Sequence, residues 1–138
     1  MRLKTLVFLV LTLSGCASQS SLLRTPVAGI SARGVLVSDT LYFGTQKPHG
    51  TVGRGEWEAF LREEVTPRFP EGLTTWEAEG QWKGKSGKII REKSRVLLLV
   101  HPDGAGSDRA VREIIEAYKK RFQQESVLRV KGRAEVSF

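Results

Sequence analysis

The 138-residue sequence contains very little cysteine and histidine: one cysteine, Cys16, and two histidines, His49 and His101. A single cysteine cannot form an internal disulfide or a multi-cysteine zinc site, which excludes disulfide scaffolds, zinc ribbons and redox CxxC motifs. The two histidines stand far apart in the chain, and there is no HExxH, EF-hand, GxGxxG or phosphate-loop pattern. We therefore expect no bound metal and no cofactor.

Long hydrophobic runs are also missing. The most apolar N-terminal stretch, residues 6–13, is far shorter than the roughly 20 residues that span a bilayer as a helix. It follows the basic residues Arg2 and Lys4, and a basic start before a short apolar run is typical of a secretory signal peptide. We therefore predict that residues 1–15 are a signal peptide that is removed, not a part of the folded domain.

The end of this stretch, Leu13-Ser14-Gly15-Cys16, resembles the lipobox of bacterial lipoproteins. The resemblance implies that the chain is cut before Cys16 and that its sulfur carries a diacylglycerol, with palmitate-type acyl chains anchoring the protein to a membrane. Ala17 follows, where the sorting rule of these lipoproteins places Asp for retention in the inner membrane. We therefore expect an exported, membrane-anchored protein of the cell envelope. In a Gram-negative organism it would lie on the outer membrane, facing the periplasm.

The remainder divides into a lipidated tether, residues 16–33, and a domain, residues 34–138. The tether is rich in Ser, Ala and Gly and shows no lasting periodicity. The domain retains 18 Lys and Arg against 15 Asp and Glu, a net charge of only +3. A nucleic-acid binder needs a concentrated basic surface, so we expect no nucleic-acid partner. The basic stretch at residues 83–95 is interpreted as a solvated hairpin edge, with contact to anionic lipid as the alternative.

Hydrophobic periodicity predicts six elements in the domain. Strands are expected at residues 35–44, 73–82, 89–100 and 128–138, with Gly132 inside the last. A first helix carries Trp57, Phe60, Leu61 and Val65 and stops at Pro67; a second starts at Ser107 as N-cap and runs to Phe122. The order β-α-β-β-α-β predicts an α+β, ferredoxin-like fold. In it, two helices cover one face of a four-stranded antiparallel sheet, and the first and third strands are central.

The third strand ends in an unbroken apolar run, Val96-Leu97-Leu98-Leu99-Val100. Such a run is apolar on both faces, and a strand of this kind needs cover on both. Two explanations remain open at this point. Long side chains of neighbouring strands cover the second face in part, or a second copy packs against it sheet to sheet, as in dimeric α/β barrels.

Several fragments together resemble a bacterial family known as domain of unknown function 3574, often found behind a lipoprotein signal. The resemblance covers residues 39–138. It is carried by residues 41–44 (LYFG), 64–70 (EVTPRFP), 72–74 (GLT), 80–82 (GQW), 96–100 (VLLLV) and 125–130 (ESVLRV). The family has no assigned chemistry, so the resemblance implies a fold and a location but no activity.

Candidate chemistry is sparse. His101, two residues before Asp103, has the residue type of a general base, but no nucleophile or oxyanion site accompanies it, and a histidine that simply closes a strand is the favoured interpretation. Trp76 and Trp82 share a face of their strand, and we expect them in the core rather than in a pocket. If the opposite parity faces the free side of the sheet, Glu77, Glu79 and Gln81 would meet Arg91 and Arg129 there in a polar, charge-paired surface. Such a surface would suit a ligand, but cross-strand ion pairs without special function give the same pattern.

Two hypotheses follow. The favoured one is a non-enzymatic lipoprotein whose domain binds a partner or forms a homodimer through the sheet face. The alternative is an enzyme or ligand-binding domain of the dimeric α/β barrel type, with its site on the free sheet face. In that alternative the residues to test are Tyr42, Gln81, Arg91 and His101, with Arg129 as a further ligand contact. Whether the partner is a protein or a small molecule stays open.

Overall fold

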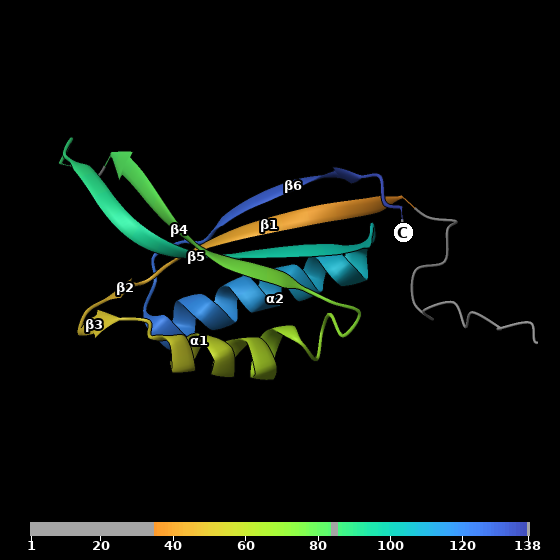
Figure 1. Ribbon diagram of the computed structural model, residues 1–138, viewed down its shortest axis with the longest axis horizontal. Helices are drawn as coiled ribbons and strands as arrows, with labels where there is room; N and C mark the ends of the chain where they lie inside the picture. The colour runs from red at the N-terminus through yellow and green to blue at the C-terminus, as the bar shows by residue number, and fades with distance from the viewer. Residues whose placement is uncertain (1–34, 84–85, 138) are drawn as a thin grey trace, which may run out of the picture.

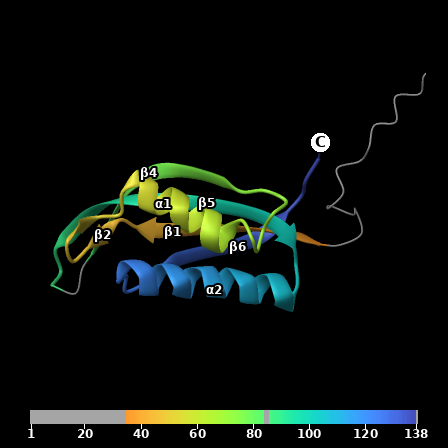
Figure 2. The same ribbon diagram turned by 90° about the horizontal axis from the view of Figure 1, so that it is seen from below.

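The computed structural model describes residues 35–83 and 86–137; Cys16, the segments predicted to be a signal peptide and a tether, and Phe138 lie outside them. Four strands form an antiparallel sheet in the order β4-β5-β1-β6. Figure 1 shows both helices beneath this sheet, and Figure 2 shows them side by side on one of its faces. The sheet strands are β1 (Leu36–Gly44), β4 (Thr74–Lys83), β5 (Ile89–Pro102) and β6 (Leu128–Ala134). This confirms the ferredoxin-like α+β fold, with the first and third sheet strands central.

The core lies between the sheet and the helices. Leu41 and Phe43 of β1 and Leu97 and Leu99 of β5 point into it and are completely buried. An aromatic cluster fills its centre, with ring centroids 4.5–6.1 Å apart; its members are Phe43, Trp57, Phe60, Tyr118 and Phe122. Because this core is complete within the described residues, the domain is expected to fold without the preceding segment.

The first helix, α1 (Arg54–Phe60), continues into a π-helical turn, η1 (Leu61–Val65). The Glu56 carboxylate accepts a hydrogen bond from the backbone N–H of the N-cap residue Gly53 at 2.9 Å, and its negative charge in the first turn favours the start of the helix. The N–H of Thr66 donates to the carbonyl of Leu61 at 2.9 Å, and the helix ends before Pro67 as predicted.

The second helix, α2 (Ala105–Phe122), begins earlier than predicted. Its N-cap is Gly104, not Ser107, and the N–H of Asp108 donates to the Gly104 carbonyl at 3.0 Å. The prediction of Ser107 as N-cap was wrong because β5 runs through His101 and Pro102, and the chain turns directly from its end into the helix. Ser107 therefore lies in the first helical turn. Neither helix of the described residues is long and apolar enough to cross a membrane.

Two hairpins extend beyond the helices. The β4–β5 hairpin projects at one end of the sheet, and a short hairpin of β2 (Gln46–Lys47) and β3 (Gly50–Thr51) lies near its base (Figure 1). The last strand, β6, ends at Ala134 rather than continuing to the C-terminus as expected. Its pairing to β1 spans only Leu36 to Tyr42 of that strand, so β6 is a short edge.

Candidate functional site

The face of the sheet that turns away from the helices is almost free of charge. Strand register places every even-numbered residue of β1, β4, β5 and β6 on this face, which we call the open face. Among these positions Glu92 is the one charged residue. An antiparallel sheet with one solvated face normally alternates apolar and polar residues. This sheet instead carries its charges on the odd-numbered positions, toward the helices and along the projecting hairpin.

Large apolar side chains form rows across the open face. One row, from β4 to β6, is Trp76, Val96, Tyr42 and Leu128. Val96 is completely buried between its aromatic neighbours, whereas Trp76 is 44% exposed and Leu128 is 60% exposed. The next row contains Leu98 and Val130, and the hairpin adds Trp82 and Ile90. Thr40, Thr74 and Ser94 are interspersed among these residues, so the face is mainly apolar and almost uncharged, a composition typical of interaction sites.

Strand β6 shows most clearly that apolar side chains lie on the open face and charged ones on the helix side. Its apolar residues Leu128 and Val130 point to the open face, while Arg129 and Lys131 point to the helix side. In a sheet that is covered on the helix side only, burial would favour apolar residues on the helix side and charged residues on the exposed side. On the helix side Arg129 is held by the buried Asp39, and the apolar residues of β6 are left exposed on the open face.

Several sequence-based placements need correction. Trp76 and Trp82 do not belong to the core; both lie exposed on the open face, because the apolar parity of β4 points away from the helices. The opposite parity, with Glu77, Glu79 and Gln81, points to the helix side and not to the free side. Gln81 does pair with Arg91, in the projecting hairpin. Arg129 meets neither of them, since it lies on β6, at the other edge of the sheet.

The four residues proposed to line one site are not brought together. Tyr42 lies on the open face, Gln81 and Arg91 lie in the hairpin on the other parity, and His101 is buried beneath the sheet. Of the four residues proposed for the alternative site, the free sheet face therefore retains Tyr42 and lacks Gln81, Arg91 and His101.

A buried ionic network surrounds Asp39, which is completely buried on the core side of β1. Its carboxylate accepts two hydrogen bonds from Arg129, at 2.7 and 2.8 Å, and one contact from His101 Nε2 at 2.9 Å. Arg129 also pairs with Asp108 of α2 at 2.8 Å. Its hydrogen bond to Asp39 raises the pKa of Arg129, and its hydrogen bond to Asp108 lowers the pKa of that carboxyl. The network joins β1, β5, β6 and α2.

His101 is fully engaged within this network. Its Nε2 faces the Asp39 carboxylate, and its Nδ1 lies 2.9 Å from the carbonyl oxygen of Pro102. Both ring nitrogens are therefore within hydrogen-bond distance of an oxygen of the protein itself. A cavity of about 310 Å³ opens beside it, lined by Phe69 and Ser107 among others. A general base needs a free ring nitrogen directed at substrate. His101 itself borders that cavity, but both of its ring nitrogens contact oxygens of Asp39 and Pro102.

Asp39 was missed in the sequence, although a signal was present. It stands between Val37 and Leu41 on the apolar parity of β1, where a charged residue breaks the alternation. A charge at a core position requires a partner, which pointed to a buried ion pair. The partner itself could not be identified, because Arg129 lies 90 residues away in the chain.

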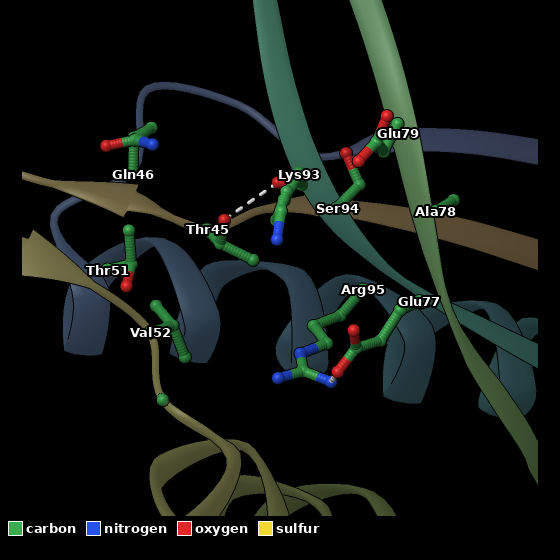
Figure 3. A pocket seen from close by; sticks show the side chains of 11 residues that line it. Thr45, Gln46, Thr51, Val52, Glu77, Ala78, Glu79, Lys93, Ser94 and Arg95 are labelled. Atoms are coloured by element: carbon green, nitrogen blue, oxygen red, sulfur yellow. Dashed lines mark hydrogen bonds and ion pairs between the residues drawn. The ribbon is translucent and has the colours of Figure 1, made fainter.

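A second cavity, of about 520 Å³, lies between the β2–β3 hairpin and the β4–β5 hairpin (Figure 3). Thr45, Thr51 and Val52 form one wall, and Lys93 and Arg95 belong to the other. No group of three or more His, Cys, Asp or Glu side chains suited to a metal ion occurs in residues 35–83 and 86–137.

The chain belongs to the family described as protein of unknown function (DUF3574), whose model matches residues 38–138. This confirms the family expected from the fragments. No curated protein matches the sequence.

Solved structures with a similar fold exist. A phage SAM lyase in complex with S-methyl-5'-thioadenosine has a TM-score of 0.57 at 16% identity, covering 72% of this chain and 82% of its own. The same phage lyase in its apo state has a TM-score of 0.54 at 16% identity, with coverages of 75% and 85%. CutA from Synechococcus elongatus PCC7942 has a TM-score of 0.52 at 8% identity, with coverages of 73% and 78%. At these identities the likeness concerns the fold alone.

Proposed function

We propose that this chain is a lipid-anchored lipoprotein of the cell envelope whose domain pairs with a second copy through the open face of its sheet. Its role would be binding or structural rather than enzymatic. The observation that carries the proposal is the open face itself, a broad apolar surface with Glu92 as its one charged position in the four strands. Depletion of charge and enrichment in Trp and Tyr characterise the buried centre of protein interfaces.

A second copy is the partner that best fits this surface. In a two-fold interface the same patch meets itself, so any charge on it faces a like charge or loses its hydration. A nearly uncharged face avoids that cost. Two such sheets pack at about 10 Å with their side chains interleaved. Trp76 and Tyr42, which flank the buried Val96, would be the central anchors of the contact.

The lipid anchor rests on the sequence. The lipobox-like residues 13–16 make Cys16 the acylated residue in this proposal. Ala17 in place of Asp is compatible with sorting to the outer membrane in a Gram-negative cell. Several acyl chains at one end would hold the protein on the membrane, where a single chain is marginal. The domain would then pair with its copy in two dimensions, which raises its effective concentration.

Self-association is tested on residues 34–138 by size-exclusion chromatography with light scattering. The parent domain is expected to be a dimer at micromolar concentration, and Trp76→Lys to be a monomer. Ile89→Lys is the matched control, because Ile89 is 59% exposed but lies on the opposite parity of the hairpin. A monomeric parent domain defeats the proposal. If that monomer binds phosphatidylglycerol vesicles and Trp76→Lys loses this binding, the open face is a lipid-binding surface instead of a dimer interface.

The anchor is tested separately by labelling cells with radioactive palmitate. Label is expected on the full chain and not on Cys16→Ser. Palmitate incorporation that persists in Cys16→Ser overturns the anchor without affecting the dimer proposal.

A further inference from the structure

The cavity between the two hairpins is lined mainly by helix-side positions of β4 and β5, and two small open-face residues, Ala78 and Ser94, also border it. We infer that it binds a small organic molecule with one carboxylate and a short apolar body. The residues that carry this inference are Arg95, Lys93, Thr51 and Val52, which line the cavity of about 520 Å³ (Figure 3).

Arg95 is the first reason. Its side chain is only 15% exposed, and within the described residues its hydrogen bonding is limited to one nitrogen, Nη1, which pairs with the exposed carboxylate of Glu77. Arg129, by contrast, uses all three of its nitrogens on Asp39 and Asp108. No buried side-chain nitrogen among the described residues lacks a partner, so the other N–H groups of Arg95 still reach solvent, and a carboxylate fits such groups in pairs.

Lys93 is the second reason. It precedes Arg95 by two positions on β5, so both side chains extend to the same side of the strand, and Figure 3 shows both reaching toward the space below the β2–β3 hairpin. No ion pair holds the Lys93 ammonium among the residues that the structure describes. The strand is fixed at this point, because Thr45 donates its hydroxyl proton to the Lys93 carbonyl at 2.8 Å and its N–H to the same oxygen at 3.2 Å.

The charges of the walls select the ligand. Lys93 and Arg95 face two acids of β4, Glu77 and Glu79, so the cavity has no net charge. A ligand with a single negative charge can lie against Lys93 and Arg95. A polyphosphate is disfavoured, because its additional charges would be repelled by Glu77 and Glu79. Opposite the cations the cavity is bordered by the small exposed part of Val52 and by Thr45 and Thr51, whose side chains carry a methyl group and a hydroxyl. A carboxylate with a short hydrocarbon tail matches both features.

The test uses residues 34–138 and amide NMR spectra during titration with butyrate. We expect saturable shifts at Thr51, Ala78, Lys93 and Arg95. Butylamine has the same tail with the opposite charge and should cause none of them, and inorganic phosphate should bind more weakly than butyrate. Absence of saturation by butyrate, or tighter binding of phosphate or butylamine, overturns the inference.

Two variants locate the site. Lys93→Ala should weaken butyrate binding about tenfold, as expected for loss of one charge-assisted contact. Arg91→Ala is the matched control, because Arg91 lies on the same parity of β5 two residues further out and does not line this cavity. If both variants weaken butyrate binding equally, butyrate is attracted to the positive charge of the surface in general, and the proposed site is wrong. Trp76→Lys should retain butyrate binding, which separates this result from the outcome for the sheet face.

Discussion

Replacing Asp39 by alanine is the most demanding test of the structure. The Asp39 side chain is completely buried and receives two hydrogen bonds from Arg129, at 2.7 and 2.8 Å, with His101 Nε2 at 2.9 Å. The variant leaves a guanidinium that is only 19% exposed without its main partner. It also leaves the Nε2 of a buried histidine without an acceptor.

The expected loss of stability is large. Removing one partner of a buried ion pair typically costs about 3–5 kcal/mol, because the other charge stays buried and uncompensated. The contact of Arg129 with Asp108 remains, which places the expectation toward the lower part of that range. A domain of this size is stable by about 5–15 kcal/mol in total. At about 4–8 °C per kcal/mol, the melting temperature should fall by roughly 12–24 °C for the lower figure.

Urea unfolding of residues 34–138, followed by far-UV circular dichroism, measures this loss. Asp39→Asn, which keeps the shape of the side chain but removes its charge, separates the ionic contribution from packing. Asp103→Ala is the control: Asp103 pairs with Lys131 at 2.7 Å on the surface, and its loss should leave stability close to that of the parent. A loss below about 1 kcal/mol for Asp39→Ala would refute the reasoning, since it would match an exposed pair.

Three further outcomes are expected. Phe60→Ala removes a completely buried ring at the centre of the aromatic cluster and should cost about 3–5 kcal/mol in urea unfolding. Burial raises the pKa of Tyr118, so the unfolded chain loses the phenol proton at lower pH than the folded protein does. The free energy of unfolding should therefore fall as pH rises above about 10. Tyr118→Phe should lessen that fall, although it also removes the hydrogen bond to the Gly44 carbonyl. The hydrogen bond between Asp108 and Arg129 lowers the pKa of the Asp108 carboxyl. The contribution of this pair to folding stability is therefore present above about pH 4 and is lost on acidification, and Asp108→Asn should make acid unfolding less steep.

Much of the fold could be predicted from the sequence because the signals are local. The alternation in β1, the apolar run in β5 and the periodic face of α2 each specify an element and one buried side. The ends of elements were less predictable. Ser107 has the residue type of an N-cap, yet α2 begins at Ala105, because the position where a strand turns into a helix depends on packing.

The candidate site was harder to predict, since it depends on which parity of each strand meets the helices. Trp76 and Trp82 are the residue types expected in a core, and their shared parity was recognised correctly. Only pairing with β5, at Trp76 to Val96 and Trp82 to Ile90, shows that this parity is the one turned away from the helices. The same pairing moves Gln81 and Arg91 to the other side.

The sequence by itself determined the order of elements, the family and the low charge of the domain, because composition and short-range periodicity carry that information. Tertiary structure alone decided which residues share a surface. It joined Asp39 to Arg129 across 90 positions and turned the apolar side of β6 outward. The physical reason is that period-2 alternation divides a strand into two sides but does not say which is covered. That is settled only when helices pack on one face and leave the other, nearly uncharged, exposed.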